Sequence, residues 1–290
     1  MINALTFDVE DYYQVQAFAD VIHPLDWSAY PGRVEKNTHR LLEILAARKI
    51  RATFFVLGWV AERYSILVDE ILNAGHEVGS HGYNHQMIGR GDENAFRADI
   101  LRAKGILEDR LGKAVTSYRA PSYSITATTL WALDILAEAG FDCDSSIFPI
   151  VHDNYGIPQA PRFPHYKSLA GGVRIAEFPP STLRIGGVNL PVAGGGYFRM
   201  LPYAMTAWSI RRINDKELQP AMVYLHPWEI DPDQPRIAAG FSSRFRHYQN
   251  LRSTEEKLLR LLDDFSWAPM SEVLAMSLEN SSGNEVGDGV

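Results

Sequence analysis

Cysteine is nearly absent from this chain, which has one in 290 residues, and long apolar runs are absent too. The single Cys143 cannot close an internal disulfide, so it is interpreted as a buried strand residue in a reducing compartment. No stretch approaches the roughly 20 apolar residues of a membrane span. The first apolar run, residues 2–7, is too short for the core of a signal peptide, and no basic segment precedes it. These absences predict a cytoplasmic protein without a membrane span.

Positive charge is in deficit, with 28 lysines and arginines against 35 acidic residues and a net charge of −7. This balance argues against a nucleic-acid partner and against an anionic membrane surface. Hydrophobic residues make up 46% of the chain, which is enough for a large core. Because α/β barrels often reach this length as one domain, a single domain is expected. A homo-oligomer is compatible with this composition.

Alternating strand and helix signals run through the first half of the chain. The expected strands are residues 2–7, 52–56, 76–80, 115–118 and 141–144, and the expected helices are residues 36–48, 60–73, 93–111 and 128–139. Gly75, Gly112 and Gly140 follow three of these helices, and glycine suits the left-handed position after a helix C-terminus. Repeated strand–helix units predict an α/β fold with a parallel sheet and external helices.

After residue 144 this alternation is lost, and long loops are expected in residues 145–220 and 229–252. The pattern predicts strands at 173–178, 182–190 and 221–225 and helices at 203–214 and 257–264. Ser253 and Glu256 have the spacing of a capping box for the last helix. The glycine run 194–196 favours a tight loop over a phosphate-binding loop, and the basic stretch 236–252 favours a solvated surface loop. The expected domain spans residues 1–276, followed by a disordered tail at 277–290.

His81 and His85 are four residues apart, directly after an expected strand. On a helical turn this spacing places both imidazoles on one face, where they can share a metal ion. The glutamate that follows the first histidine in zincin metalloproteases is missing, which argues against that class. Because sites in α/β proteins lie at the carboxyl ends of strands, the position favours a metal site over two structural histidines.

Three carboxylates, Asp8, Glu10 and Asp11, follow the first expected strand. Crowded carboxylates repel one another unless a cation or an arginine compensates, so a plain solvated turn is the weaker interpretation. If the strand continues, Asp8 and Glu10 share a face, with Asp8 as a base and Glu10 as a metal ligand. If the chain turns after Val9, Asp11 becomes the rival ligand.

Arg119 and His226 also stand at the ends of expected strands. An arginine there can pair with a buried carboxylate, lower the carboxylate pKa and fix its orientation. A histidine there can serve as a general acid. Taken alone, each has an ordinary alternative, a surface arginine or a core histidine. The metal motif elsewhere in the chain favours the functional interpretation.

Five motifs, taken in order, resemble those of the NodB-type polysaccharide deacetylases, carbohydrate esterase family four. They are Thr6-Phe7-Asp8, His81-Gly82-Tyr83-Asn84-His85, Arg119-Ala120-Pro121, Asp142-Cys143-Asp144-Ser145-Ser146 and Leu225-His226. The resemblance runs from residue 5 to about residue 275, and it is strongest to a subgroup found with bacterial exopolysaccharide and O-antigen gene clusters. The chain departs from the family at two positions. Val9 replaces the second aspartate of an Asp-Asp pair, and Gly82 replaces a residue with a hydroxyl group.

The resemblance implies a distorted (β/α) barrel, often with seven strands. It also implies one divalent metal, expected to be zinc, held by His81, His85 and a carboxylate. Asp8 would take a proton from the attacking water, and Arg119 would orient Asp8.

The same resemblance assigns roles on the substrate side of the site. The backbone N–H of Ser122 would help to stabilise the oxyanion, and Tyr123 and Trp228 would contact the substrate. His226 would protonate the departing amine, with Asp144 as the partner that tunes the pKa of His226.

The function that the resemblance implies is removal of an N-acetyl group from an amino sugar or glycan intermediate in bacterial surface or exopolysaccharide biosynthesis. One alternative is hydrolysis of a small cyclic amide, as in allantoinase-like relatives. Another is an inactive glycan-binding module, which only the Val9 departure supports. A third is a non-haem iron oxygenase, whose triad also has two histidines and a carboxylate. An oxygenase needs neither Asp8 as a base nor His226 as an acid, so these residues argue against it.

Overall fold

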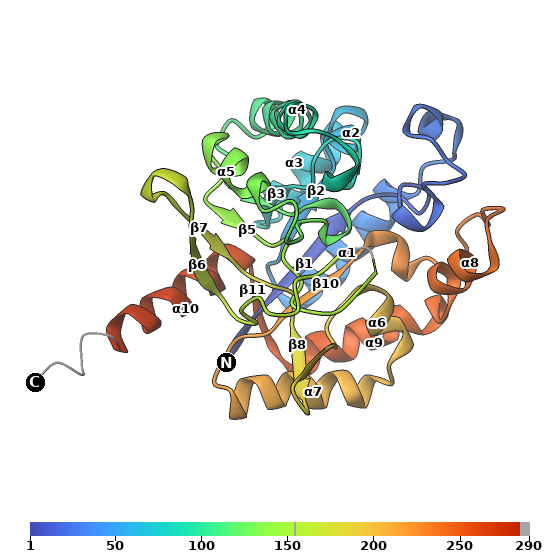
Figure 1. The fold of residues 1–290 in the computed structure, drawn as a ribbon. Helices are drawn as coiled ribbons and strands as arrows, with labels where there is room; N and C mark the ends of the chain where they lie inside the picture. The colour runs from blue at the N-terminus through green and yellow to red at the C-terminus, as the bar shows by residue number, and fades with distance from the viewer. Residues whose placement is uncertain (154, 285–290) are drawn as a thin grey trace, which may run out of the picture.

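Seven parallel strands form the main sheet of the computed structural model, which describes residues 1–153 and 155–284 (Figure 1). Their spatial order is β10 (Met222–Leu225), β1 (Ile2–Val9), β2 (Thr53–Val56), β3 (Glu77–Ser80), β4 (Ser117–Tyr118), β5 (Cys143–Asp144) and β7 (Arg174–Glu177). Every neighbouring pair in this order is parallel. Among the described residues no strand pairing joins β7 to β10, so the barrel is open between them. The predicted α/β class and the seven-stranded distorted barrel are confirmed.

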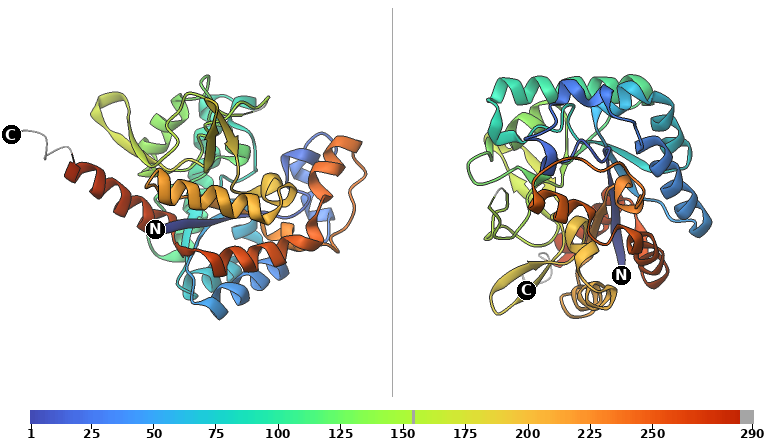
Figure 2. Two further views of the ribbon diagram at one scale, coloured as in Figure 1. Left: turned by 90° about the horizontal axis from the view of Figure 1, so that it is seen from below. Right: turned by 90° about the vertical axis from the view of Figure 1, so that its right-hand side faces the viewer.

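Helices lie around the outside of the sheet, as the two views of Figure 2 show. They are α1 (Val34–Arg48), α2 (Gly58–Arg63), α3 (Ser65–Asn73), α4 (Glu93–Leu111), α5 (Trp131–Glu138), α6 (Gly195–Met200), α7 (Tyr203–Lys216), α8 (Phe241–Tyr248), α9 (Leu251–Asp264) and α10 (Met270–Asn284). Fully buried side chains such as Phe7, Phe54 and Leu107 fill the layer between helices and sheet. Within the described part of the chain, every helix is too short or too polar to span a lipid bilayer.

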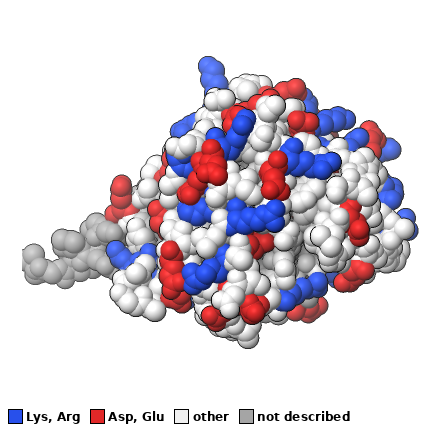
Figure 3. Space-filling model, turned by 90° about the horizontal axis from the view of Figure 1, so that it is seen from above, with Lys and Arg blue, Asp and Glu red and all other residues white. Residues whose placement is uncertain are grey.

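Several charged residues on the outer surface are paired across neighbouring helices. Arg97 of α4 pairs with Glu138 of α5, and Arg110 of α4 pairs with Asp69 of α3. Figure 3, which views the face that carries α4, shows basic and acidic side chains interleaved. Such exposed pairs contribute little to stability individually, and they leave this face without a single-sign patch.

Shorter strands extend the main sheet or lie apart from it. β6 (His165–Ser168) is antiparallel to β7, and β11 (Ser266–Ala268) is parallel to the start of β1. β8 (Thr182–Ile185) and β9 (Val188–Pro191) form a separate hairpin. Gly186 and Gly187 both have positive φ, the backbone that a tight two-residue hairpin turn requires. The prediction of one continuous strand at 182–190 is therefore wrong, because the glycine pair folds it in two.

The opening between β7 and β10 is filled by the segment that follows β7. Ser181 exchanges two hydrogen bonds with Met222 of β10, and Gly194 forms a bridge with Tyr224. Gly194 lies so close to the Tyr224 ring that a Cβ atom would overlap the ring. Its φ of 147° is a backbone conformation that glycine adopts readily and other residues rarely adopt. Helix α6 starts immediately after this contact, so the tight loop predicted at 194–196 is the first turn of a helix instead.

The N-terminal end of the barrel interior is closed by α10. Met270, Val273 and Leu274 of this helix are buried against a cluster that includes Ala4 and Met222 from the central strands. Burial of this apolar face, which extends to Leu278, stabilises α10, and the helix continues to Asn284. The prediction of a disordered tail is thus wrong for residues 277–284, and residues 285–290 lie outside the described part of the chain.

Three other local predictions also need correction. The helix expected at 60–73 is two helices, α2 and α3, which meet at Tyr64. Helix α9 begins at Leu251 after Asn250, so Ser253 lies inside the helix and the capping box does not form. Helix α8 occupies part of the expected surface loop at 236–252, where Phe18 packs on the His247 ring. For α8, the contact with Phe18, far away in the sequence, is one that no local pattern could indicate.

Candidate active site

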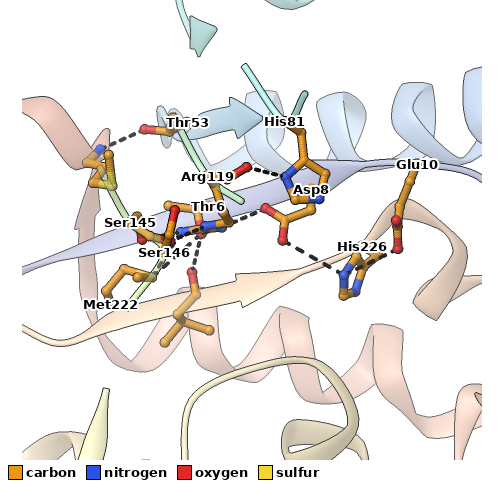
Figure 4. Close-up of polar contacts among 12 residues, drawn as sticks. Thr6, Asp8, Glu10, Thr53, His81, Arg119, Ser145, Ser146, Met222 and His226 are labelled. Carbon is orange, nitrogen blue, oxygen red and sulfur yellow. Dashed lines mark hydrogen bonds and ion pairs between the residues drawn. The ribbon is translucent and has the colours of Figure 1, made fainter. Parts of the chain in front are cut away.

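A buried ion pair between Asp8 and Arg119 lies at the carboxyl ends of β1 and β4 (Figure 4). Thr6 and Asp8 are two residues apart on β1, so their side chains lie on the same face and point into the barrel. Both accept hydrogen bonds from Arg119 Nη1, at 2.8 and 2.6 Å. Arg119 is fully buried and also donates to the carbonyl and hydroxyl oxygens of Ser145. Burial alone would lower the pKa of Arg119, but the Asp8 carboxylate outweighs it and holds that pKa above its usual value. The carboxylate is thereby held in one orientation.

Glu10, His81 and His85 converge on one point next to Asp8. One ligand atom from each lies within 4.8 Å of the others, and all three residues are buried. His81 donates its Nδ1–H to the Arg119 carbonyl oxygen at 2.8 Å, which fixes the tautomer and leaves Nε2 free to bind a metal. Burial lowers the pKa of His81 to about 4, so the ring is neutral, as a ligand must be.

The donor set fits a divalent cation. Glu10 Oε2 is buried and has no hydrogen-bond partner among the described residues, although it lies 2.8 Å from His85 Nε2. A buried carboxylate oxygen beside an imidazole nitrogen needs a proton or a cation between the two, and a divalent ion bound by both atoms would meet this need. Two imidazoles and one carboxylate leave further coordination positions open, as in catalytic metal sites.

Asp11, the rival ligand, is absent from this group. Its carboxylate accepts hydrogen bonds from the backbone N–H groups of Tyr12, Arg33 and Val34, at 2.9, 2.6 and 2.9 Å. The last two belong to the start of α1, so Asp11 satisfies the free donors at the beginning of that helix. The alternative in which Asp11 binds the metal is therefore wrong, and Glu10 faces the two histidines.

His226 follows β10 and faces the metal group from the other side. Its Nε2 lies 3.4 Å from Glu10 Oε1 and 3.8 Å from Asp8 Oδ2. Its Nδ1–H donates to Glu229 Oε1 at 2.6 Å. Burial would lower the pKa of His226, but the carboxylates of Glu10 and Glu229 raise it to about 9. The imidazole thus carries a proton on the side that faces the site.

Glu229 is a residue that the sequence analysis missed. It is fully buried, and its other oxygen accepts a hydrogen bond from Arg199 Nε at 2.7 Å. Arg199 is anchored in turn by the carbonyl oxygens of His247 and Gln249. Glu229 stands three residues after His226, and this spacing in the motif Leu-His-Pro-Trp-Glu was the available signal. Arg199 gave no such signal, because its partners are 30 to 50 residues away.

Asp144 does not contact His226, so its predicted role as the pKa partner of that histidine is wrong. It accepts a hydrogen bond from Ser146 at 2.5 Å and lies against the buried Glu177. Burial and the neighbouring Asp144 charge raise the pKa of Glu177 well above its usual value. We therefore expect the two carboxyl groups to share a proton. Ser146 also accepts a hydrogen bond from the backbone N–H of Ala120. Through Ser146, the pair of Asp144 and Glu177 therefore supports the loop that carries Arg119.

A cavity of about 170 Å³ opens over these groups. Its lining includes the predicted substrate-contacting residues Ser122, Tyr123 and Trp228. Trp228 donates its indole N–H to Glu10 Oε1 at 3.2 Å and stacks on the His226 ring. Ser122 and Tyr123 both have φ near +54°, an unfavourable backbone that presents this turn to the cavity. Ten of the eleven predicted site residues thus line this cavity or, like Arg119 and Asp144, lie buried behind its lining. The eleventh, Asp11, lies apart at the start of α1.

Comparisons with known proteins agree with this geometry. Residues 4–143 match the family model described as polysaccharide deacetylase, and residues 145–275 match a domain of unknown function, DUF3473. A peptidoglycan-N-acetylglucosamine deacetylase of Bacillus cereus is 34% identical over 98 residues, which are 33% of this chain and 36% of that protein. A peptidoglycan deacetylase of Helicobacter pylori is 33% identical over 117 residues, which are 39% of this chain and 38% of that protein. The chain thus spans little more than a third of these relatives.

Solved structures share the fold over almost the whole chain. A candidate polysaccharide deacetylase from Mycobacterium smegmatis superposes with a TM-score of 0.60 at 23% identity, covering 97% of this chain and 91% of that one. The peptidoglycan deacetylase PdaC from Bacillus subtilis gives a TM-score of 0.51 at 15% identity, covering 99% and 97%. At these identities the likeness concerns the fold.

Proposed function

We propose that this chain, whose residues 4–143 match the polysaccharide deacetylase family model, is a metal-dependent hydrolase that removes an N-acetyl group from a sugar. The observation that carries the proposal is the placement of a metal-ligand group, a clamped carboxylate and a protonated histidine around one cavity. Amide hydrolysis needs these three functions: an activated water, a base that accepts its proton, and an acid that protonates the departing nitrogen.

Asp8 is the base of the proposed reaction. Arg119 donates a hydrogen bond to Asp8 Oδ1. The other oxygen, Asp8 Oδ2, faces the cavity and lies 3.8 Å from His226 Nε2. An arginine-clamped carboxylate cannot rotate away from the attacking water, so its position costs no reorganisation during proton transfer.

His226 is the acid. Its Nδ1–H is committed to Glu229, so Nε2 is the nitrogen that presents a proton to the cavity. Arg199 holds Glu229 on the opposite side, and stacking on Trp228 fixes the ring plane. A proton held at a defined atom can be delivered to the amine as the C–N bond breaks.

Glu10, His81 and His85 would hold the metal, and we propose zinc on the basis of this nitrogen and oxygen donor set. When bound, such an ion lowers the pKa of water and polarises a carbonyl oxygen. Glu10 replaces the carboxylate that Val9 cannot supply, which argues against the inactive glycan-binding alternative. Trp228 donates its indole N–H to one oxygen of Glu10, and His85 faces the other.

The proposed substrate is an N-acetylated amino sugar within a glycan or glycan precursor. Support comes from the names of the relatives, which are peptidoglycan and chitin deacetylases. The 170 Å³ cavity is smaller than the roughly 300–1,000 Å³ of whole-ligand sites, so it suits an acetamido group and little more. We further propose a role in exopolysaccharide or O-antigen synthesis and a cytoplasmic location.

Acetate release by the zinc-loaded protein tests this function. The panel contains N-acetylglucosamine, its neutral oligomers, uridine diphosphate N-acetylglucosamine and allantoin as the cyclic-amide control. We expect acetate from at least one sugar, and Asp8→Asn to reduce the rate about 10²–10⁴-fold while the metal stays bound. Turnover of allantoin alone, or an unchanged rate in Asp8→Asn, would contradict the proposal.

A further inference from the structure

A second and larger cavity, of about 730 Å³, opens beside the proposed active site. Val15, Gln16 and His85 line both cavities, so the two spaces adjoin. The proposed chemistry uses only the smaller one. A volume of 730 Å³ falls within the range of sites that bind whole small molecules. The larger cavity can therefore hold what is attached to the N-acetylated sugar.

Two loops build the larger cavity, one after β1 and one after β3. The first supplies Tyr13 and Trp27, and Trp59 at the start of α2 adds a third aromatic ring. The Trp59 ring meets Trp27 edge-on at 5.5 Å and Tyr13 at 6.5 Å, which makes the wall rigid. Trp59 is only half-buried, so part of its ring faces the cavity. Such a surface suits the apolar face of a sugar ring.

Amide side chains complete the lining. Gln16 and Asn84 are half-buried and Gln86 is exposed, and all three line the cavity. Amides both donate and accept hydrogen bonds, as the hydroxyl groups of a sugar require. Aromatic rings together with amides therefore indicate a carbohydrate.

The charge of this lining differs from that of the whole chain. The protein has 35 acidic residues, yet none belongs to the described lining, which contains Arg90 and Arg102. Arg102 is already satisfied, because it stacks on Tyr83 and donates to the Tyr83 hydroxyl at 2.6 Å and to Glu62 at 3.4 Å. Arg90 is exposed and has no acidic partner among the described residues. On the α4 face, by contrast, basic and acidic side chains are interleaved (Figure 3).

We propose that the larger cavity binds an anionic group next to the N-acetylated sugar, and that Arg90 recognises it. The inference rests on the proposed deacetylation, and it specifies the substrate class. A carboxylate of a neighbouring acidic sugar and a phosphate of a carrier-linked sugar share this chemistry. Either anion pairs with a guanidinium through charge-assisted hydrogen bonds, and a neutral oligosaccharide cannot.

The experiment compares acetate release by the zinc-loaded full chain from three probes. They are di-N-acetylchitobiose, a disaccharide of N-acetylglucosamine and glucuronate, and uridine diphosphate N-acetylglucosamine. We expect kcat/KM to be at least about tenfold higher for an anionic probe than for the neutral one, as one charge-assisted hydrogen bond would give. The preferred anionic probe identifies whether the carboxylate or the phosphate is the natural source.

Arg90→Gln tests the residue itself and should remove most of the ratio between the anionic and neutral probes. Arg212→Gln is the matched control, because Arg212 is exposed on α7 outside both cavities. It should leave the ratio unchanged. An equal kcat/KM for neutral and anionic probes, or an unchanged ratio in Arg90→Gln, would overturn the inference.

Calorimetric binding of the same probes to Asp8→Asn separates this inference from the proposed reaction. Absence of acetate from every probe would contradict the deacetylase function but would leave the binding comparison readable. Tighter binding of an anionic probe, weakened by Arg90→Gln, supports the cavity assignment. Failure of both anionic probes to bind, or equal affinity for the neutral one, overturns it.

Discussion

Residues 4–143 and residues 145–275 contribute to the site in different ways. The first region supplies Asp8, Glu10, His81, His85 and Arg119 from the ends of regular parallel strands. The second supplies His226 from the end of β10, Glu229 from the turn that follows it, and Arg199, which pairs with Glu229, from α6. In the proposed reaction the first region would thus hold the metal ion and the base, and the second would control the proton on the acid.

The largest effect should follow from removing both histidines of the first region. In His81→Ala/His85→Ala, bound metal should fall from about one per chain to nearly none, because two of three ligands are lost. Activity should fall by more than the roughly 10²–10³-fold that loss of one oxyanion donor costs. Elemental analysis and acetate release measure the two quantities. The control is His39→Ala, which changes a half-buried histidine on α1 that pairs with Glu70 outside the site, and full metal retention in the double variant would refute this site.

Removing the acid of the second region should have the next largest effect, and a selective one. His226→Ala should slow amide hydrolysis about 10²–10⁴-fold but slow hydrolysis of an activated aryl acetate much less, since that leaving group needs no proton. Rates on both substrates are compared at equal metal content. An equal loss on the two would mean that His226 only supports binding or structure, and the comparison between regions would fail.

Glu229→Gln tests whether the second region acts through His226. The variant keeps an acceptor for the Nδ1–H of His226 but removes the charge, so we expect about a 10–100-fold loss of kcat on the amide with little change in KM. The loss should be smaller on the aryl acetate, as for His226→Ala, which a merely structural role would not produce. Glu70→Gln, which changes a half-buried glutamate on α3 that pairs with His39 outside the site, should change neither rate.

The smallest effect concerns stability and the shared proton of Asp144 and Glu177. Because the folded pKa of Glu177 is raised, its stabilisation is complete below the unfolded value near 4.5 and is lost as pH rises through the folded pKa. Each pKa unit corresponds to about 1.4 kcal/mol. The amide of Glu177→Gln can donate a hydrogen bond to Asp144 at any pH in this range, because it has no titrating proton to lose. The variant should therefore gain stability relative to wild type as pH rises from 5 to 9.

Urea unfolding of both proteins at pH 5, 7 and 9, with metal saturating throughout, measures this difference. Glu35→Gln, which changes an exposed carboxylate on α1, should show no such trend. A constant difference between Glu177→Gln and wild type across this range would mean that the pair does not share a proton.

Local sequence patterns were sufficient for much of the first region. Buried strands bounded by helices with glycine after their C-termini predict the parallel sheet, and the carboxyl ends of its strands meet at one edge. Asp8, His81 and Arg119 could therefore be expected close together. The choice between Glu10 and Asp11 could not be made, because it depends on α1, whose free N–H groups bind Asp11.

The second region could be predicted only in part. Two of its features are marked locally in the sequence. The glycine pair Gly186-Gly187 indicates a hairpin turn, and Glu229 stands three residues after His226. The partner of His226 was nevertheless assigned to Asp144, which belongs to a different buried pair. Arg199 was overlooked because no local pattern marks an arginine whose carboxylate partner is 30 residues away.

The sequence by itself determined the α/β class, the strand-end positions of the reactive side chains and the motifs of a deacetylase, since these depend on short-range periodicity and residue type. Only the tertiary structure decided which carboxylate faces the histidines, which one supports His226, and that α10 closes the barrel. Those outcomes depend on burial: a charged group removed from water must find a partner, and in a folded chain that partner can come from any segment.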